Sequence, residues 1–489
     1  RQAHNLKAAG SNPAPATKAK KPRKKTRGLL LLGAPQSRFR CHRWLGQPPG
    51  GRTLDRFPKY LNFNSKFLPA LPPKLSFGKR VRAVLMTIDM LHVMEWHNGD
   101  KVFRPFSDAE MARRHAAIRN WMAGNEVGAV LFTSLPCIGY FSGWRYQAFG
   151  RRYAMVVTQD AATTVSSGVD GGLAWRNGYG QNVTYTDWRR DNFYRAVRQL
   201  TAGVQRLGIE FDHVSLDFRR LLEAALPGVE MVDAGPAAMW MRVVKSAEEL
   251  ALIRTGAAIC DVGAKAAVDA IREGAPEFEV AIASDTAMSR AISARFPHVE
   301  PLEGRTWIRS GIQTDGAHNP ATNRQMRCGD ILSLTCAPML FGYRTTLGRT
   351  LFLGEPDVAS RAVWEQNLAV HRRGLELVRP GARCNEIAAE LNAMYREMGL
   401  LKRRSSAYGH SCGIVCQQSG GEAAIDLRED VVTELQPGMV VSMEPMVMLP
   451  EGSAGAGGYR EQDMLIVTED GAERLSEFPA GPDHNVILC

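Results

Sequence analysis

One histidine stands in a turn whose composition suits proton transfer. His318 lies in the stretch TDGAHNP, between two runs of strand-forming residues, and it follows Asp315 and Gly316. An imidazole is the side chain most easily poised to give and take a proton near neutral pH, and a turn between strands can direct it into a cleft. A histidine with a purely structural role would fit the same position, so the neighbouring motifs have to distinguish the two interpretations.

Three later stretches carry polar residues that could belong to the same site. Glu444 ends the apolar run of PGMVVSMEPM, His410 lies in SAYGHSCG, and Gln462 lies in GGYREQDMLIV. A carboxylate at the end of a buried strand needs a compensating partner. That partner could be a local arginine, or it could be a cationic group of a ligand, since a carboxylate accepts paired N–H bonds. We interpret these stretches as separate strands that supply one polar site.

Two cysteines near His410 raise the question of a zinc site. Cys412 and Cys416 follow it within six positions. Zinc takes four ligands, and its cysteine ligands usually come in closely spaced pairs. The three residues lack both a fourth ligand and that spacing, so we interpret the cysteines as small core residues.

The basic charge of the chain is concentrated at its beginning. The 489 residues carry a formal net charge of +11, but residues 1–85 alone hold 20 Lys and Arg against one acidic residue, Asp55. That segment contributes +19 and leaves the remainder at −8. A mildly acidic body lacks the basic face that binds a nucleic-acid backbone. We therefore expect no nucleic-acid partner.

Residues 1–89 form a basic leader with no sign of a fold. The segment begins at Arg1, passes through KAKKPRKKTR, and shows neither helical nor strand periodicity. We predict that it is disordered or precedes the native protein, with Met86, Met90 or Met94 as candidate starts. A basic targeting arm is the alternative.

Neither an export signal nor a membrane span is evident in the sequence. The run of four leucines at 29–32 is too short for a signal-peptide core or for a membrane span. The nine cysteines are odd in number and show no paired spacing, which is typical of free thiols in a reducing compartment. We expect a cytoplasmic protein without membrane contact.

The elements that must position the polar residues fall into two groups. In residues 90–244, helical patterns alternate with strand patterns, which predicts an α/β domain. Ser107 and Glu110 have the spacing of a capping box at the start of its first helix. The expected helices cover 106–122, 192–200 and 218–225, and the expected strands cover 129–133, 154–158, 208–211 and 229–232.

Residues 245–489 show a different order of elements. Ser246 and Glu249 form a second capping-box signature, and the helix that they open runs toward Ala270. Further helices are expected near 278–294, 359–378 and 385–398, with groups of antiparallel strands between and after them. This order predicts an α+β domain.

Several long motifs resemble one known family. They are TDGAHNP, GDILSL, GYRTTLGRTLFLG, PGMVVSMEPM, LPEG and GAGGYRE. They resemble the creatinases, the creatine amidinohydrolases of the creatinase, prolidase and aminopeptidase P group, and the resemblance runs from about Asn98 to the C-terminus. It implies an α+β pita-bread catalytic domain, preceded by a smaller α/β creatinase-type N-terminal domain. It also implies a homodimer with the site at the interface.

The resemblance assigns roles to individual residues. His318 falls on the proton-shuttling histidine of the family, and Glu444 falls on a carboxylate that binds the substrate's guanidinium, so we predict catalytic roles for both. Phe149 and Arg151, in QAFGRRYAMVV, fall on residues that bind the substrate carboxylate across the dimer interface. The other predicted substrate contacts are His410, Tyr343, Arg344 and Gln462.

The resemblance also argues against a metal cofactor. The dinuclear members of the group use two Asp, one His and two Glu, and those positions fall on Thr335, Thr346, His410, Glu444 and Gln462. Hard divalent cations need the carboxylate oxygens that the two threonines lack. We therefore predict a metal-independent hydrolase without a cofactor.

Departures from the creatinase pattern leave the substrate open. Gly348 stands where the family has a second guanidinium-binding Glu, and Gly421 stands where it has an active-site Arg. Gln462 replaces a histidine, Arg344 a tyrosine and Arg309 a glutamine. Because losing one of two carboxylates weakens the binding of a buried cation, creatine itself is in question.

The predicted function is hydrolysis of a C–N bond in creatine, giving sarcosine and urea, or in a related small carboxylate-bearing compound. An ectoine-hydrolase-like enzyme acting on another substrate is one alternative. A catalytically silent member of the family is the other.

Overall fold

The computed structural model describes residues 92–102, 104–147, 149–301, 304–404, 406–414 and 423–489. The leader 1–89 lies outside the described residues. So do the candidate starts Met86 and Met90, and Cys416 and Gly421.

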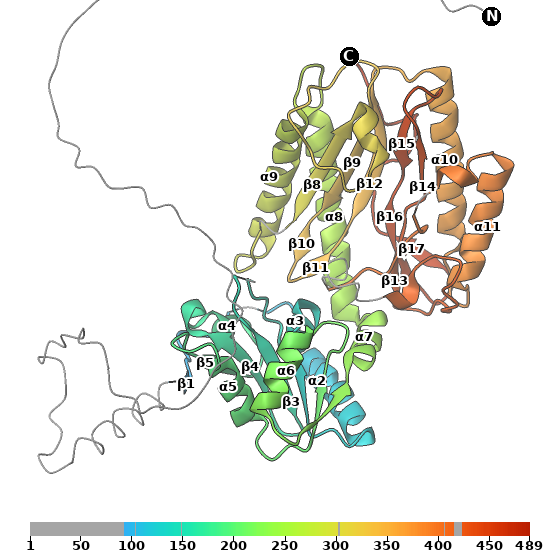
Figure 1. Ribbon diagram of the computed structural model, residues 1–489. Coiled ribbons are helices and arrows are strands. Elements are labelled where there is room, and N and C mark those ends of the chain that lie inside the picture. Colours follow the sequence, from blue (N-terminus) through green and yellow to red (C-terminus); the bar gives the residue numbers. More distant parts are fainter. Residues whose placement is uncertain (1–91, 103, 148, 302–303, 405, 415–422) are drawn as a thin grey trace, which may run out of the picture. The chain divides into compact units, whose positions relative to one another are not determined.

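A seven-stranded mixed sheet forms the first part of the fold (Figure 1). In spatial order its strands are β1 (Val93–Met94), β5 (Gln181–Tyr185), β4 (Ala162–Ser167), β3 (Ala154–Thr158), β2 (Ala129–Phe132), β6 (Arg206–Ile209) and β7 (Glu230–Asp233). The strand β3 runs antiparallel to both of its neighbours, whereas the β4–β5, β2–β6 and β6–β7 pairs are parallel.

Side chains cover both faces of this sheet. In β2, Val130 and Phe132 belong to one core cluster, and Ala129 and Leu131 belong to another. This alternation is expected for a strand that is buried on both sides, and the predicted α/β class of this part is confirmed. The helices are α2 (Asp108–Gly124), α3 (Leu135–Ser142), α4 (Leu173–Asn177), α5 (Asn192–Leu200), α6 (Leu216–Ala225) and α7 (Gly235–Val243).

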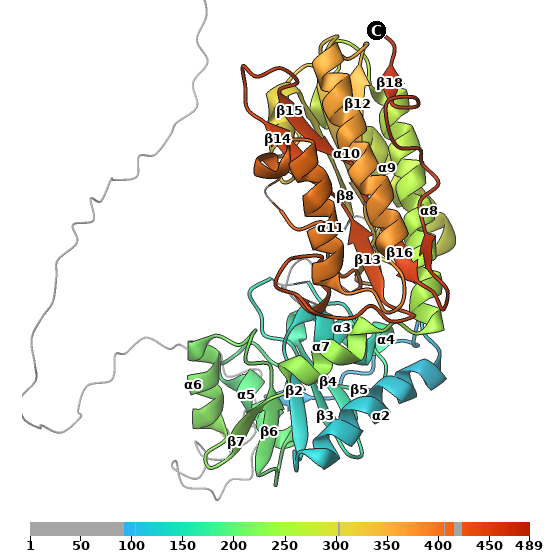
Figure 2. The same ribbon diagram turned by 90° about the vertical axis from the view of Figure 1, so that its right-hand side faces the viewer.

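The second part places helices along several small antiparallel sheets. Its helices are α8 (Ala247–Ala270), α9 (Glu277–Arg295), α10 (Val358–Leu377) and α11 (Cys384–Glu397). Figures 1 and 2 show α8 and α9 beside the sheet that contains β8, β9 and β12, and α10 beside the strands of the other half. The predicted α+β class of this part is confirmed. No helix in the described ranges is both long and apolar enough to cross a membrane.

The strands of the second part form four sheets. The largest is β18 (Val486–Ile487), β12 (Leu347–Leu353), β9 (Ile331–Ala337) and β8 (Arg305–Ser310), in that order. A three-stranded sheet contains β13 (Val440–Met443), β16 (Asp463–Val467) and β17 (Ala472–Arg474). The two-stranded sheets are β10 (Met339–Leu340) with β11 (Tyr343–Arg344), and β14 (Met446–Leu449) with β15 (Gly457–Arg460).

The two predicted capping boxes have different outcomes. At the start of α8, the Ser246 hydroxyl accepts a hydrogen bond from the Glu249 N–H at 3.3 Å, and the Glu249 carboxylate accepts one from the Ser246 N–H at 2.9 Å. At the start of α2, the Ser107 hydroxyl accepts from the Glu110 N–H at 3.1 Å, but the Ser107 N–H donates to Glu248 at 2.8 Å instead. The Ser246–Glu249 capping box is confirmed, and only half of the Ser107–Glu110 one forms.

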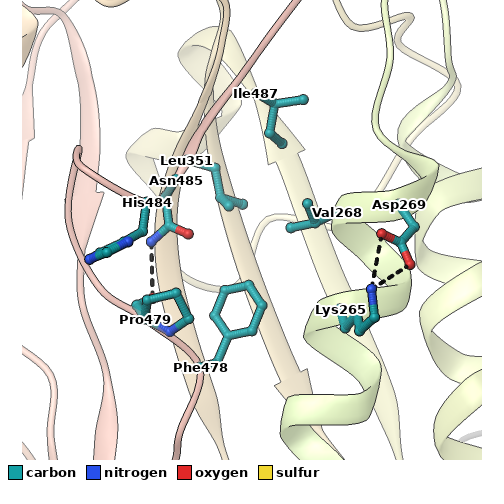
Figure 3. A pocket seen from close by; sticks show the side chains of 9 residues that line it. All are labelled: Lys265, Val268, Asp269, Leu351, Phe478, Pro479, His484, Asn485 and Ile487. Carbon is teal, nitrogen blue, oxygen red and sulfur yellow. Dashed lines mark hydrogen bonds and ion pairs between the residues drawn. The ribbon is translucent and has the colours of Figure 1, made fainter.

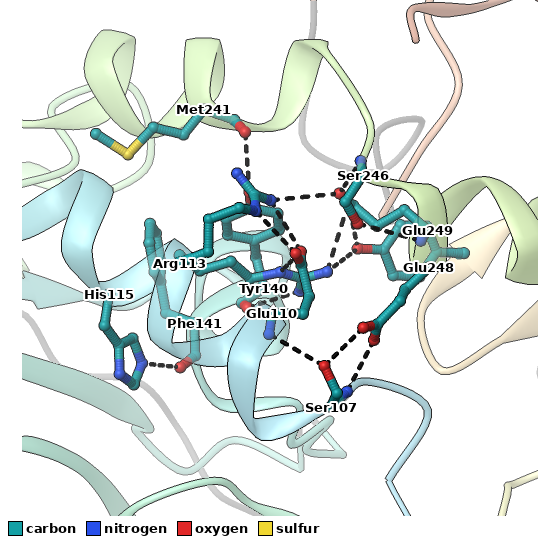
Figure 4. Close-up of polar contacts among 12 residues, drawn as sticks. Ser107, Glu110, Arg113, His115, Tyr140, Phe141, Met241, Ser246, Glu248 and Glu249 are labelled. Carbon is teal, nitrogen blue, oxygen red and sulfur yellow. Dashed lines mark hydrogen bonds and ion pairs between the residues drawn. The ribbon is translucent and has the colours of Figure 1, made fainter.

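A buried charged network explains why Glu110 does not complete its capping box (Figure 4). Its carboxylate accepts hydrogen bonds from Arg113 at 2.8 Å and from Arg114 at 2.7 Å. The Nη2 atom of Arg114 also lies 3.7 Å from Glu249, and the two side chains are 0% and 1% exposed. The Tyr343 hydroxyl donates to Glu249 at 2.7 Å. This network, which we call the α2–α8 network, joins α2 to α8 and β11.

One pair of cysteines contradicts the prediction of free thiols. Cys328 and Cys489 form a disulfide across a sequence separation of 161 residues, a distance along the chain at which no spacing motif could reveal it. The neighbouring strand β18 pairs in parallel with β12, so the C-terminal end of the chain is fastened to this sheet. The other described cysteines are free and buried: Cys137, Cys260, Cys336, Cys384 and Cys412.

Candidate active site

One face of the β8–β9–β12 sheet is polar, and the other packs into the core. The leucines of β9 belong to a core cluster, so Ser333 and Thr335 point to the opposite face by strand alternation. The strand register places Arg309 of β8 and Thr350 of β12 on either side of Ser333, and it places Gly348 opposite Thr335. These five residues define the polar face.

The end of β15 and the short segment that leads into β16 form hydrogen bonds with the polar face. Gly348 N–H donates to Gln462 O at 3.1 Å, and Gln462 N–H donates to Gly348 O at 2.8 Å. Arg460 N–H donates to the Thr350 hydroxyl at 2.8 Å, and the Arg460 guanidinium donates to the Thr335 hydroxyl. The side chains of Arg460 and Gln462 therefore belong to the same site as the polar face.

Glu444 and His410 meet in an ion pair. The Nε2 atom of His410 lies 3.1 Å from Oε1 of Glu444, and the two side chains are 29% and 16% exposed. Backbone hydrogen bonds fix both residues, because Ser442 N–H donates to His410 O at 2.9 Å and Glu444 N–H donates to Tyr408 O at 2.7 Å. The Nη1 atom of Arg460 lies 3.8 Å from Oε2 of Glu444. Glu444 thus has both a histidine and an arginine as partners.

The two members of this pair hold each other in their charged forms. Burial alone would lower the pKa of His410, but the Glu444 carboxylate and Cys412 together outweigh burial and raise that pKa well above its usual value. Burial alone would raise the pKa of Glu444, but His410 and Arg460 outweigh it and lower that pKa. A cationic His410 can donate hydrogen bonds, but it cannot act as a general base.

A second buried network lies behind the junction of β12 and β16. Arg349 donates to Asp463 at 2.8 Å, to Gly348 O at 2.7 Å and to Gln462 O at 2.8 Å. Asp463 also lies 3.2 Å from Nε2 of His371. Burial opposes ionisation of Asp463, but Arg349 and His371 together outweigh it and lower the pKa of this carboxyl. The network positions the two strands at the point where Gly348 and Gln462 face each other.

His318 lies in an exposed turn that is tied to the polar face through its neighbour. The turn follows the 3₁₀ helix η3 (Gly311–Asp315). The Asn319 carbonyl accepts a hydrogen bond from Arg309 at 2.8 Å, and the Asn319 amide donates to Asp315 at 2.9 Å. His318 itself makes no hydrogen bond or ion pair with any described residue. The structure brings His410 and Glu444 together, and it does not bring His318 into contact with them.

The remaining predicted substrate contacts make other interactions. Phe149 is 72% exposed. Arg151 lies 3.1 Å from Asp187, and both side chains are partly exposed. Tyr343 is buried, and its hydroxyl belongs to the α2–α8 network. Arg344 follows it in β11 and is partly exposed.

The five positions that would hold two metal ions do not fit them. Thr335 and Thr346 offer neutral hydroxyls, and the Thr335 hydroxyl accepts a hydrogen bond from a guanidinium instead. Gln462 offers a neutral amide, whose oxygen is buried and accepts no hydrogen bond from any described residue. The described part of the chain contains no group of three His, Cys, Asp or Glu side chains arranged to hold a metal ion. His410 and Glu444 alone supply too few ligands for a divalent cation.

Sequence reasoning missed Arg460 as a member of the site. It stands two positions before Gln462 in the stretch YREQ, and strand alternation places residues i and i+2 on one face. That spacing could have identified it once Gln462 was assigned to the site.

A surface pocket between α8 and the C-terminal segment is separate from this site (Figure 3). Lys265 and Asp269 of α8 form an ion pair at one side of the pocket, 3.2 Å apart, and Leu351 of β12 contributes to its lining. Leu351 points to the face of β12 opposite to Gly348 and Thr350, so the pocket lies behind the polar face.

Comparison with known proteins covers both parts of the fold. Residues 114–244 match the creatinase/prolidase N-terminal domain, and residues 251–469 match metallopeptidase family M24. The creatinase of Bacillus sp. (strain B-0618) is 52% identical over 397 residues, which cover 80% of this chain and 96% of that protein. The Xaa-Pro dipeptidase of Pyrococcus horikoshii is 25% identical over 361 residues, which cover 74% and 95%.

Solved structures share the fold at lower identity. The prolidase of Pyrococcus horikoshii OT3 has a TM-score of 0.65 at 22% identity and covers 75% of this chain and 99% of its own. The X-Pro aminopeptidase of Thermotoga maritima MSB8 has a TM-score of 0.66 at 18% identity, with coverages of 77% and 99%. These likenesses concern the fold alone, whereas the match to the Bacillus creatinase extends over nearly all of that protein at more than half identity. This chain therefore belongs to the creatinase family, with a creatinase-type N-terminal domain followed by a pita-bread catalytic domain.

Proposed function

We propose that the protein is a metal-independent hydrolase of the creatinase type, which cleaves a C–N bond of creatine or of a related small carboxylate-bearing compound. The observation that carries this proposal is the His410–Glu444 ion pair, in a site where threonines occupy the positions of the bridging carboxylates. Such a site can bind and orient a polar substrate without a metal ion. The 52% identity to the Bacillus creatinase supports the reaction class.

In the proposed reaction, His318 serves as general base and then as general acid. It takes a proton from water as the water oxygen attacks the amidino carbon. It then gives that proton to the leaving amine as the C–N bond breaks, so that creatine and water give sarcosine and urea. His410 is held as a cation by Glu444, which leaves His318 as the imidazole available for proton transfer. The link from its neighbour Asn319 to Arg309 supports a place for the turn at the edge of the site.

Glu444 would receive the substrate's amidino group. A carboxylate accepts paired N–H bonds from a planar cation or amidine, and His410 and Arg460 already hold this carboxylate in its charged form. In the family a second carboxylate shares this task, and Gly348 stands in its place here. This loss favours a second candidate function, in which the substrate is a small carboxylate-bearing amide or cyclic amidine, in the manner of the ectoine hydrolases.

We also propose a homodimer in which Phe149 and Arg151 reach the site of the partner subunit. Phe149 is 72% exposed, so its ring is accessible to a partner subunit. We also propose, from the sequence alone, that the protein works in the cytoplasm.

A panel assay of the purified protein tests the proposed function. Urea and amine release are measured with creatine, with small carboxylate-bearing amides and with cyclic amidines, in parallel with Glu444→Gln. We expect turnover of at least one of these compounds and its loss in the variant. A parent protein that releases no product from any of them would refute hydrolysis and favour the catalytically silent alternative. Turnover that Glu444→Gln leaves intact would place the chemistry elsewhere.

A further inference from the structure

Arg309 is a fully buried guanidinium that contacts no carboxylate among the described residues. Its exposed fraction is 0%. Its Nε donates to Asn319 O at 2.8 Å, and its Nη1 donates to the Ser333 hydroxyl at 3.0 Å. The remaining nitrogen, Nη2, is buried and has no hydrogen-bond partner in the described part of the chain. A buried charge that only neutral groups contact is costly.

Other buried arginines of this protein do have carboxylate partners. Arg114, also 0% exposed, donates to Glu110 at 2.7 Å. Arg349, 1% exposed, donates to Asp463 at 2.8 Å. The fold thus gives these two guanidinium groups carboxylate contacts, whereas Arg309 has none among the described residues, and only Glu277, beyond ion-pair distance, favours its charged form.

The surroundings of Arg309 add positive charge. Burial, together with the nearby charge of Arg460, lowers the pKa of Arg309 to about 9. Arg460 has Glu444 as its ion-pair partner at 3.8 Å, but that carboxylate also holds His410 at 3.1 Å. His410 and Arg460 therefore share the one carboxylate of Glu444, and Arg309 has no ion pair with it. The Nε atom of Arg460 and the Oε1 atom of Gln462 are also buried, and neither has a hydrogen-bond partner among the residues that the structure describes.

We infer that Arg309 and Arg460 form a subsite for a carboxylate group of the substrate, and that Arg309 determines substrate class in this protein. The unused N–H groups of two guanidinium groups match the acceptor oxygens of a carboxylate. This subsite lies on the polar face of the β8–β9–β12 sheet. It is separate from Phe149 and Arg151, which we propose to reach the site from the partner subunit. The inference rests on the proposed function, because it names the kind of substrate that the same site takes.

Binding of small probes tests the subsite without turnover. Acetate is compared with acetamide, which has nearly the same shape and no charge, and with inorganic phosphate and N-methylguanidine. Dissociation constants come from calorimetry or from the dependence of the melting temperature on probe concentration. We expect acetate to bind at least about tenfold more tightly than acetamide, since a hydrogen bond to a charged group contributes more than one to a neutral group. N-methylguanidine is a cation that suits Glu444 rather than two guanidinium groups, so we expect Arg309→Gln not to weaken its binding.

Three variants assign the effect to Arg309. Arg309→Gln should weaken acetate binding about 10- to 100-fold, the range expected for loss of a charge-assisted contact. Arg309→Lys keeps the positive charge but lacks the planar guanidinium group. Its affinity for acetate should therefore lie between that of the parent and that of Arg309→Gln. Arg305→Gln makes the same change at an exposed position of the same strand and should leave acetate binding unchanged. The melting temperature of each variant without probe reports whether it folds.

The outcomes separate this inference from the proposed function. Equal affinities for acetate and acetamide, or acetate binding that Arg309→Gln and Arg309→Lys both leave intact, would overturn the subsite whether or not the protein is an active hydrolase. Phosphate bound more tightly than acetate would overturn the assignment to a carboxylate. Acetate binding that depends on Arg309 would support the subsite even in a protein that hydrolyses nothing in the substrate panel.

Discussion

Nε2 of His410 lies 3.1 Å from Oε1 of Glu444, and the two residues come from segments that pair through their backbones. The contact joins a base and an acid that are each charged near neutral pH. The contact therefore identifies His410 as the histidine that is already in its cationic form. The same contact predicts how the stability of the protein depends on pH.

The pair should stabilise the fold most between about pH 4.5 and pH 6.5, the usual pKa values of Glu and His. The pKa of His410 is raised in the folded state, so its contribution is complete below the unfolded value and is lost as pH rises through the folded one. The pKa of Glu444 is lowered, so its contribution is complete above the unfolded value and is lost as pH falls through the folded one. Urea denaturation of the parent and of the double variant His410→Gln/Glu444→Gln measures the difference in unfolding free energy, which should shrink from about pH 6 toward pH 9. A difference that stays constant over this range would contradict the charged pair.

His318→Ala should abolish turnover and leave the fold intact. General acid–base catalysis contributes roughly 10²- to 10⁴-fold to rate, and the proposed mechanism uses this imidazole for both proton transfers. Steady-state kinetics and the melting temperature are measured together. His298→Ala, a matched change at another exposed histidine of the same domain, should keep full activity. A His318→Ala protein that retains most of the parent kcat would assign proton transfer to another group.

Chelating agents should leave the activity unchanged. Thr335 and Thr346 cannot bridge two divalent cations, and the Thr335 hydroxyl already accepts a hydrogen bond from Arg460. The measurement is turnover before and after prolonged treatment with EDTA and phenanthroline, with elemental analysis of the purified protein. Stoichiometric manganese, iron or zinc, or activity that returns only when metal is restored, would show a metalloenzyme.

Arg114→Met should destabilise the protein by about 3–5 kcal/mol, because it leaves the carboxylates of Glu110 and Glu249 buried with less positive charge beside them. Arg113 contacts the same Glu110 at 2.8 Å, but it is 49% exposed. Arg113→Met is therefore the matched control and should cost about 1 kcal/mol or less. Urea denaturation of both variants tests this difference. Equal effects would mean that burial does not control the strength of the α2–α8 network.

Much of the fold could be predicted because local sequence determines its helices and strands. The expected helix at 192–200 is α5, and the expected helices at 359–378 and 385–398 differ from α10 and α11 by one residue at each end. The helix α3 was missed, although Ser134 caps it and a proline occupies its first turn. Those two residue types are a common helix start, and they would have revealed α3.

The candidate site could be predicted only in part, because its contacts depend on how distant strands meet. The importance of Glu444 and His410 followed from the family motif, but their ion pair follows from the pairing of segments more than thirty positions apart in sequence. Arg309 was recognised as a departure from the family, yet its lack of a carboxylate partner is visible only when every neighbour of the polar face is known. No local pattern specifies such an absence.

Gly348 is the position that separates creatine from the other candidate substrates. It faces Gln462 across two backbone hydrogen bonds, of 3.1 and 2.8 Å. A Cβ atom at Gly348 would lie 2.9 Å from Cβ of Gln462 and 3.2 Å from Nη2 of Arg460. A larger side chain therefore requires Gln462 to move together with its backbone, because the close contact is with its Cβ. A carboxylate placed there would lie beside the guanidinium of Arg460.

Gly348→Glu should raise creatine turnover from a low parent value by about tenfold or more, since it restores a second carboxylate for the substrate's cation. Gly348→Ala is the steric control, because it introduces the same Cβ contact without a charge and should not improve turnover. Adding Arg344→Tyr should increase the gain, as it removes a positive charge four positions before Gly348 and replaces it with the residue type of the family. Steady-state kinetics on creatine for the parent and these variants is the measurement. Efficient turnover by the parent would mean that another residue supplies the missing carboxylate and that creatine is the substrate of the protein as it stands.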